Sequence, residues 1–127
     1  MQIHDSNSVR ILLANLPEPL TQLISELVEK QQYMHIVGHV EGRLEVLVAA
    51  SSGVDLVIMG AVSLHPPPGI ASHLLNEFPQ IKIVVMSTTD DTAIGYWLGV
   101  HRKRINRSSV DTLLDEIEAL FKATPTL

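Results

Sequence analysis

The chain has 127 residues, of which 46% are apolar and 18% are charged, so we expect one globular domain with a sizeable core and exclude a disordered chain. The net charge of -5 disfavours broad nucleic-acid binding, and the absence of cysteine excludes disulfides, thiol chemistry and cysteine-ligated metals. The first residues lack a signal-peptide pattern and no apolar run is long enough to cross a membrane, which predicts a cytoplasmic protein.

Apolar periodicity predicts strands and helices that alternate along the chain. After a polar, disordered tail at 1–8, the predicted elements are a strand at 9–14, a helix at 17–31, a strand at 34–40, a helix at 41–50, a strand at 55–59, a helix at 70–78 and a strand at 81–86. Residues 87–91 read as a loop and helix cap. They are followed by a helix carrying Ile94, Trp97 and Leu98, a strand at 102–105, a last helix at 108–121 and a tail at 124–127.

Five strand–helix units in succession predict an α/β domain at 9–123, with a five-stranded parallel sheet and helices on both faces. The third strand runs from Asp55 to Met59 without alternation, as in a strand buried on both faces, and it ends at Gly60. Ligands and chemistry lie beyond the carboxyl ends of parallel strands, yet Gly60 offers no functional side chain there. Gly60 fits either a ligand cleft, since glycine permits close approach, or a site that has lost its chemistry.

Four segments together resemble bacterial response-regulator receiver domains, most closely those that precede a helix-turn-helix output domain. They are Val-Arg-Ile-Leu-Leu at 9–13, Ile-Val-Gly-His-Val at 36–40, Asp-Leu-Val-Ile-Met at 55–59 and Pro-Gln-Ile-Lys-Ile-Val-Val-Met-Ser at 79–87. The resemblance covers residues 9 to 121. It implies a doubly wound, flavodoxin-like fold and a phosphorylation site at the carboxyl ends of the strands.

The residues of that site do not carry over. Receivers hold magnesium with two carboxylates after the first strand, where this chain has Asn15 and Leu16, and Gly60 replaces the phosphate-accepting aspartate. The hydroxyl residue is retained as Ser87, and the lysine after the fifth strand aligns with Asn106. Without a nucleophile or strong magnesium ligands, phosphoryl transfer is not expected. The resemblance therefore implies a pseudo-receiver that is not an enzyme and binds neither magnesium nor another cofactor.

Other polar groups have ordinary interpretations. Ser87 could bind an anion, but capping of the next helix is favoured, and Asp90 and Asp91 are typical of a helix start. The chain has six histidines, of which His35 and His39 are too far apart along a strand to share a metal. No metal site is expected, because zinc sites require three or four ligands.

The sharpest local signal is the basic stretch at 101–107 in an otherwise acidic protein. It is typical of an edge strand protected by charge, or of a docking patch for an acidic partner or a nucleic-acid backbone. The resemblance implies an interaction face built from the fourth helix, fifth strand and fifth helix. Its candidate residues are Trp97, Arg102, Lys103, Arg104, Arg107, Asp111, Asp115 and Glu118. Opposite charges could pair across a homodimer, while Trp97 is either core, which we favour, or an exposed anchor.

The leading hypothesis is a non-catalytic receiver-like module of two-component-type signal transduction that regulates through protein–protein contact, with a partner or as a homodimer. The alternative is a small-ligand-sensing regulatory domain, with or without control of an appended DNA-binding output domain. Nucleic acid would then be bound only by that output domain, and no membrane partner is expected.

Overall fold

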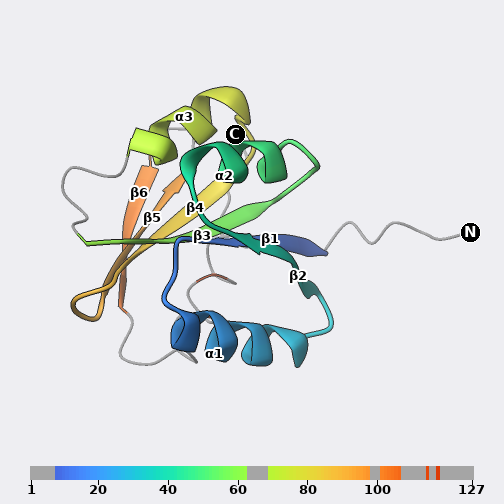
Figure 1. Ribbon diagram of the computed structural model, residues 1–127, viewed down its shortest axis with the longest axis vertical. Helices are drawn as coiled ribbons and strands as arrows, with labels where there is room; N and C mark the ends of the chain where they lie inside the picture. Colours follow the sequence, from blue (N-terminus) through green and yellow to red (C-terminus); the bar gives the residue numbers. More distant parts are fainter. Residues whose placement is uncertain (1–7, 63–68, 98–100, 107–113, 115–116, 118–127) are drawn as a thin grey trace, which may run out of the picture.

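The computed structural model describes residues 8–62, 69–97 and 101–106, the last of these as backbone, together with Leu114 and Ile117. Figure 1 shows a central sheet with helices on both sides. The elements in chain order are β1 (Val9–Ala14), α1 (Glu18–Glu29), β2 (Met34–Val40), α2 (Arg43–Ala50), β3 (Leu56–Ala61), α3 (Gly69–Glu77), β4 (Lys82–Ser87), β5 (Thr92–Trp97) and β6 (His101–Asn106). The α/β class and the first seven predicted elements are confirmed, with no end shifted by more than two residues.

The sheet has six strands in the order β2-β1-β3-β4-β5-β6. The first four are parallel, but β5 runs antiparallel to β4, and β6 runs antiparallel to β5. The prediction of a five-stranded, fully parallel sheet is therefore wrong. The sheet is mixed, with a parallel half built by strand–helix crossovers and a second half built by hairpins.

The helix predicted to carry Ile94 and Trp97 is instead strand β5. Its sequence, Thr-Ala-Ile-Gly-Tyr-Trp, is rich in β-branched and aromatic residues and has a glycine in its interior, all of which favour a strand over a helix. The strand is buried from Ala93 to Tyr96 because β4 and β6 flank it and both of its faces meet the core. The apolar spacing that predicted a helix also fits a strand buried on both faces.

Helices cover both faces of the sheet, as predicted. On one face α1 packs through Ile24 and Val28, together with Leu114 and Ile117. On the other face α2 and α3 pack through Val46, Ala50, Ile70, Ala71 and Leu74 (Figure 1). Leu114 and Ile117 are helical and buried, at 7% and 0% exposure, as expected for the last predicted helix. The rest of that helix, the tail at 1–7 and the tail at 124–127 lie outside the described residues.

The two central strands explain the sequence pattern around them. All six residues of β4 are buried, and so are the first four residues of β3. Their side chains alternate between the two core clusters, which requires apolar residues at successive positions. The prediction of a third strand buried on both faces is confirmed.

The two edges of the sheet are β2 and β6. In β2 the pairing with β1 shifts register after Ile36, which leaves Val37 as an extra residue. Such bulges and charged residues are common at sheet edges, where they discourage pairing with other chains. The predicted basic strand is found at the opposite edge as β6, in agreement with the edge-strand interpretation.

One buried charge lies at the start of β4. Lys82 is 8% exposed and lies in register between Leu56 of β3 and Trp97 of β5. Burial lowers the pKa of the Lys82 ammonium from its ordinary value of 10.5, and the nearby Asp55 carboxylate partly opposes that shift. Burial of the protonated Lys82 side chain therefore lowers the free energy of unfolding.

We expect Lys82→Met to raise the free energy of unfolding near pH 7 by on the order of 1 kcal/mol, because methionine fills similar space without a buried charge. A lowered folded-state pKa means that the unfolded chain binds more protons than the folded chain between that lowered pKa and 10.5. The wild type should therefore gain stability as the pH rises through that window. Urea unfolding at pH 7 and pH 10 should show the gap between variant and wild type shrinking. Lys30→Met, at the exposed end of α1, controls for the loss of one surface charge, and a gap that widens with pH would contradict the prediction.

Candidate functional site

The carboxyl ends of β1, β3 and β4 meet at one edge of the sheet and bring together Asn15, Leu16, Gly60 and Ser87. Ala61 pairs with Ser87 in the parallel register, and the Thr88 backbone N–H donates to the Ala61 carbonyl at 2.9 Å. The Asn15 N–H donates to the Val40 carbonyl at 3.0 Å, which joins the end of β2 to the same edge. This part of the predicted pocket is therefore assembled as the sequence suggested.

Gly60 is closely packed. A Cβ atom at this position would lie 2.6 Å from the Asn15 carbonyl oxygen, 3.1 Å from Thr88 Cγ2 and 3.3 Å from Leu16 Cδ2. The shortest of these contacts is to backbone, which cannot rotate away as a side chain can. Gly60 is thus a packing requirement of the β1–β3 junction, because a side chain at this position would meet the Asn15 backbone.

Leu16 stands where the resemblance to receivers predicts an acidic magnesium ligand. Its side chain is 8% exposed and belongs to the core cluster that faces α1. The apolar side chain therefore both removes a ligand and covers the end of β3 beside Gly60. Burial in the core also gives Leu16 a structural role that a carboxylate could not take.

Asn15 has a structural role as well. Its backbone is left-handed, with a φ of 55°, a conformation that asparagine tolerates better than most residues. Its side-chain Oδ1 accepts a hydrogen bond at 3.0 Å from the Gly42 N–H, at the N-cap of α2. The amide oxygen is thus committed to linking the end of β1 to the start of α2.

Ser87 holds the β4–β5 hairpin together. It is 4% exposed, and its Oγ accepts hydrogen bonds from the backbone N–H groups of Thr89 at 3.1 Å and Asp90 at 3.2 Å. A further hydrogen bond of 3.0 Å joins Ser87 Oγ to Thr89 Oγ1. Ser87 therefore caps backbone N–H groups, as predicted. It does so in a hairpin loop and not at a helix start, because strand β5 follows.

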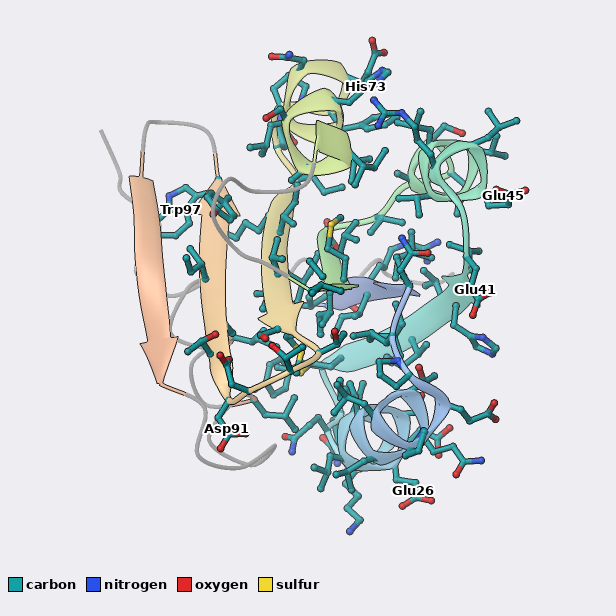
Figure 2. The ribbon with its side chains drawn as sticks, turned by 60° about the vertical axis from the view of Figure 1, so that its left-hand side comes forward. Glu26, Glu41, Glu45, His73, Asp91 and Trp97 are labelled. Carbon is teal, nitrogen blue, oxygen red and sulfur yellow. The ribbon has the colours of Figure 1, made fainter. Side chains whose placement is uncertain are left out.

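The acidic pair is likewise part of this hairpin and not of a helix start. Asp90 Oδ1 accepts from the Thr92 N–H at 2.9 Å and from the Thr92 hydroxyl at 2.6 Å, a local pattern that favours a turn. Asp91 is exposed at the end of the loop (Figure 2). The prediction of a helix cap at Asp90 and Asp91 is therefore wrong, and its chemistry is that of an Asx turn.

Asn106, the fifth predicted member of the pocket, lies away from the other four. It pairs with Thr92 of β5, and β5 lies between β6 and β4. Two inter-strand spacings, about 10 Å, therefore separate the backbone of β6 from that of β4. The hairpin strand β5 therefore keeps Asn106 away from the other predicted site residues.

The predicted interaction face also changes. Trp97 lies on β5 and is partly buried against the core on the α1 side, which agrees with the core interpretation. Arg102, Lys103 and Arg104 occupy the edge strand β6, whose side chains lie outside the described residues. Arg107, Asp111, Asp115 and Glu118 also lie outside the described residues. The predicted face cannot include a helix that carries Ile94 and Trp97, because Thr92–Trp97 is strand β5.

Sequence reasoning missed a groove beside the closed site. An open cavity of about 440 Å³ separates the start of α1 from the β4–β5 loop. Its lining residues are Pro17, Pro19, Leu20, Leu23, Ser87, Thr88, Thr89, Asp90 and Asp91. The sequence gives no clear signal for this groove. Leu23 recurs at the helical spacing typical of core residues, yet 45% of it is accessible to solvent.

Within the described residues, no group of three or more histidine, aspartate or glutamate side chains could hold a metal ion. None of the described helices combines the length and apolar character needed to span a membrane. Comparisons of the chain with protein-family models, with curated proteins and with solved structures found no match. The residues and their geometry are therefore the basis for any functional proposal.

Proposed function

We propose that this chain is a cytoplasmic, non-catalytic, receiver-like regulatory module that acts through protein–protein contact and not through aspartyl phosphorylation. The observation that carries the proposal is the closed edge at Gly60, where the Asn15 carbonyl leaves no room for a side chain. A phosphate acceptor needs a carboxylate at that position and a hard cation beside it. Leu16 and Asn15 occupy the positions expected for the cation ligands, and the Asn15 amide oxygen already accepts a hydrogen bond from the Gly42 N–H.

The parallel half of the sheet supports the receiver-like part of the proposal. Its strand order, β2-β1-β3-β4, and its helices on both faces are compatible with a flavodoxin-like arrangement. The antiparallel hairpin β4–β5 departs from the receiver pattern. The departure removes the fourth helix, so a regulatory contact has to use other surfaces of the molecule.

Incubation with acetyl phosphate and Mg²⁺, followed by intact mass measurement, tests the proposal. We expect no phosphoryl adduct, while a receiver domain with an intact acidic site treated in parallel should acquire one. A stable adduct on this chain would contradict the proposal. The experiment needs no knowledge of the partner.

A small-ligand sensor is the second candidate, and the groove between α1 and the β4–β5 loop is the observation that favours it. The groove is open, with apolar side chains on one wall and hydroxyl and carboxylate residues on the other. A ligand there would contact the hairpin that Ser87 and Asp90 hold in place. A thermal-shift screen of nucleotides and metabolites tests this candidate, since a ligand that binds the folded state raises Tm.

A further inference from the structure

Helix α2 is apolar on two opposite sides. Six of its eight residues are apolar, and Val46 and Ala50 are buried against the sheet at 0% and 3% exposure. Leu44 and Val48, four residues apart, are 67% and 62% exposed. Because each turn has 3.6 residues, these two side chains share one face of the helix, opposite Val46.

Such a helix is unusual on a protein surface. A helix in contact with solvent normally carries polar residues on its outer face, whereas a helix that is apolar all round is typically covered on both sides. Single exposed apolar residues are common, but here two form one stripe. Valine also has a lower helix propensity than polar helix formers such as lysine or glutamine. In the isolated domain, one of those residues at position 48 would therefore stabilise the helix more than Val48 does.

The charges beside this stripe are negative on one side. Glu41 is exposed just before α2, and the Glu45 carboxylate folds back over Gly42 at the helix N-terminus, where the helix dipole favours an anion. Arg43 is directed the other way, with its guanidinium 3.7 Å from a Cβ position at Gly69 of α3. Figure 2 shows Glu41 and Glu45 on the side of α2 that faces away from α3.

We propose that the outer face of α2, formed by Leu44 and Val48 with Glu41 and Glu45 beside them, docks a basic amphipathic helix of a partner protein. The proposal rests on the regulatory function proposed above, for which it supplies the contact surface. Leucine-type side chains on the partner would cover Leu44 and Val48, and lysine or arginine beside them would pair with the two glutamates.

The same charges disfavour other occupants of the outer face of α2. In a two-fold pair of antiparallel α2 helices, the glutamate side of one copy would meet the glutamate side of the other, where like charges repel. An anionic membrane would be repelled for the same reason. A basic helix is the occupant that satisfies both the apolar stripe and the acidic side.

A peptide titration of the ¹⁵N-labelled full chain tests the proposal. The probe is a synthetic amphipathic helix with a leucine stripe flanked by lysines, and its control carries glutamates in place of the lysines. We expect saturable amide shifts within residues 41–52 for the lysine peptide and at least tenfold weaker binding for the glutamate peptide. Equal affinity for both peptides, or shifts centred on another element, would overturn the proposal.

Two variants separate the apolar and charged parts of the surface. Leu44→Gln with Val48→Gln should weaken the lysine peptide at least tenfold and leave Tm unchanged, because both side chains are already exposed. Glu41→Gln with Glu45→Gln should also weaken binding and should reduce its salt dependence. Leu23→Gln, at an exposed leucine of α1, is the matched control and should bind as the wild type does.

Further measurements on the same samples distinguish the alternatives. Two results would each overturn the choice of a basic helix. One is a dimer in light scattering that the Leu44→Gln, Val48→Gln variant abolishes. The other is binding of the wild type to phosphatidylserine vesicles. Mass measurement after acetyl phosphate treatment tests the proposed function separately. An adduct there with normal peptide binding would refute the non-catalytic proposal alone.

Discussion

Replacing Gly60 with aspartate, the residue that a receiver carries at this position, is expected to destabilise the protein by about 3 kcal/mol without creating a phosphorylation site. The new Cβ would lie 2.6 Å from the Asn15 carbonyl, so β1 and β3 would have to separate to admit it. The carboxylate would also enter an edge covered by Leu16. Urea unfolding measures the loss, and mass measurement after acetyl phosphate treatment tests for the adduct.

Gly60→Ala and the double variant Gly60→Ala, Leu16→Ala are the controls. Gly60→Ala alone should retain most of the steric cost, about 2 kcal/mol, because the backbone contact arises from Cβ itself. Removing the Leu16 side chain relieves the 3.3 Å contact but not the contact to Asn15, so it should not rescue Gly60→Ala. A Gly60→Asp protein as stable as the wild type, or one that is phosphorylated, would show that this edge can open.

Tyr96→Ala is expected to lower the free energy of unfolding by on the order of 3 kcal/mol, because Tyr96 is buried in the same core cluster as Ile94. The size of the effect distinguishes a strand from a helix at 92–97. Residues two apart share a face in a strand, but in a helix Tyr96 would lie about 200° from Ile94 and face solvent. Denaturant unfolding of the purified variant measures the change.

Tyr96→Phe is the matched control for this experiment, because it removes the hydroxyl and keeps the ring. It should cost much less than Tyr96→Ala if ring burial dominates. A loss below about 0.5 kcal/mol for Tyr96→Ala, the range of an exposed substitution, would contradict the position of β5 in the sheet.

The parallel half of the fold could be predicted from the sequence because its patterns are long and bounded. Unbroken apolar runs identify β3 and β4, and apolar residues at helical spacing identify α1. The failure at 91–98 arose where a short apolar segment fits both periods. There the apolar spacing favoured a helix, while Gly95 and the aromatic residues Tyr96 and Trp97 favoured the strand that is found.

The candidate site could be predicted only in part. Asn15, Leu16, Gly60 and Ser87 converge because they lie at the carboxyl ends of parallel strands, and the alternation of strands and helices predicted that these strands are parallel. Asn106 does not join them because β5 is inserted between β4 and β6. The closure at Gly60 depends on the path of the Asn15 carbonyl, a backbone detail with no sequence signature.

The exposed face of α2 could not be predicted from the sequence either. The sequence predicts a helix that carries Leu44, Val46, Leu47 and Val48, and apolar residues on several sides of a short helix carry no information on which side meets the sheet. Packing of α2 on the sheet buries Val46 and leaves Leu44 and Val48 in solvent. Tertiary packing thus separates a core residue from a contact residue that are equally apolar.

The central proposal is that the carboxyl edge of the parallel strands accepts neither a phosphoryl group nor the magnesium ion that would accompany it. Amide spectra of the ¹⁵N-labelled chain, recorded with Mg²⁺ alone and with Mg²⁺ and beryllofluoride, test this most directly because beryllofluoride mimics a phosphoryl group on a receiver. We predict that the amides of Gly60, Ala61, Ser87 and Thr88 do not shift under either condition. Saturable, magnesium-dependent shifts of these four amides would contradict the account.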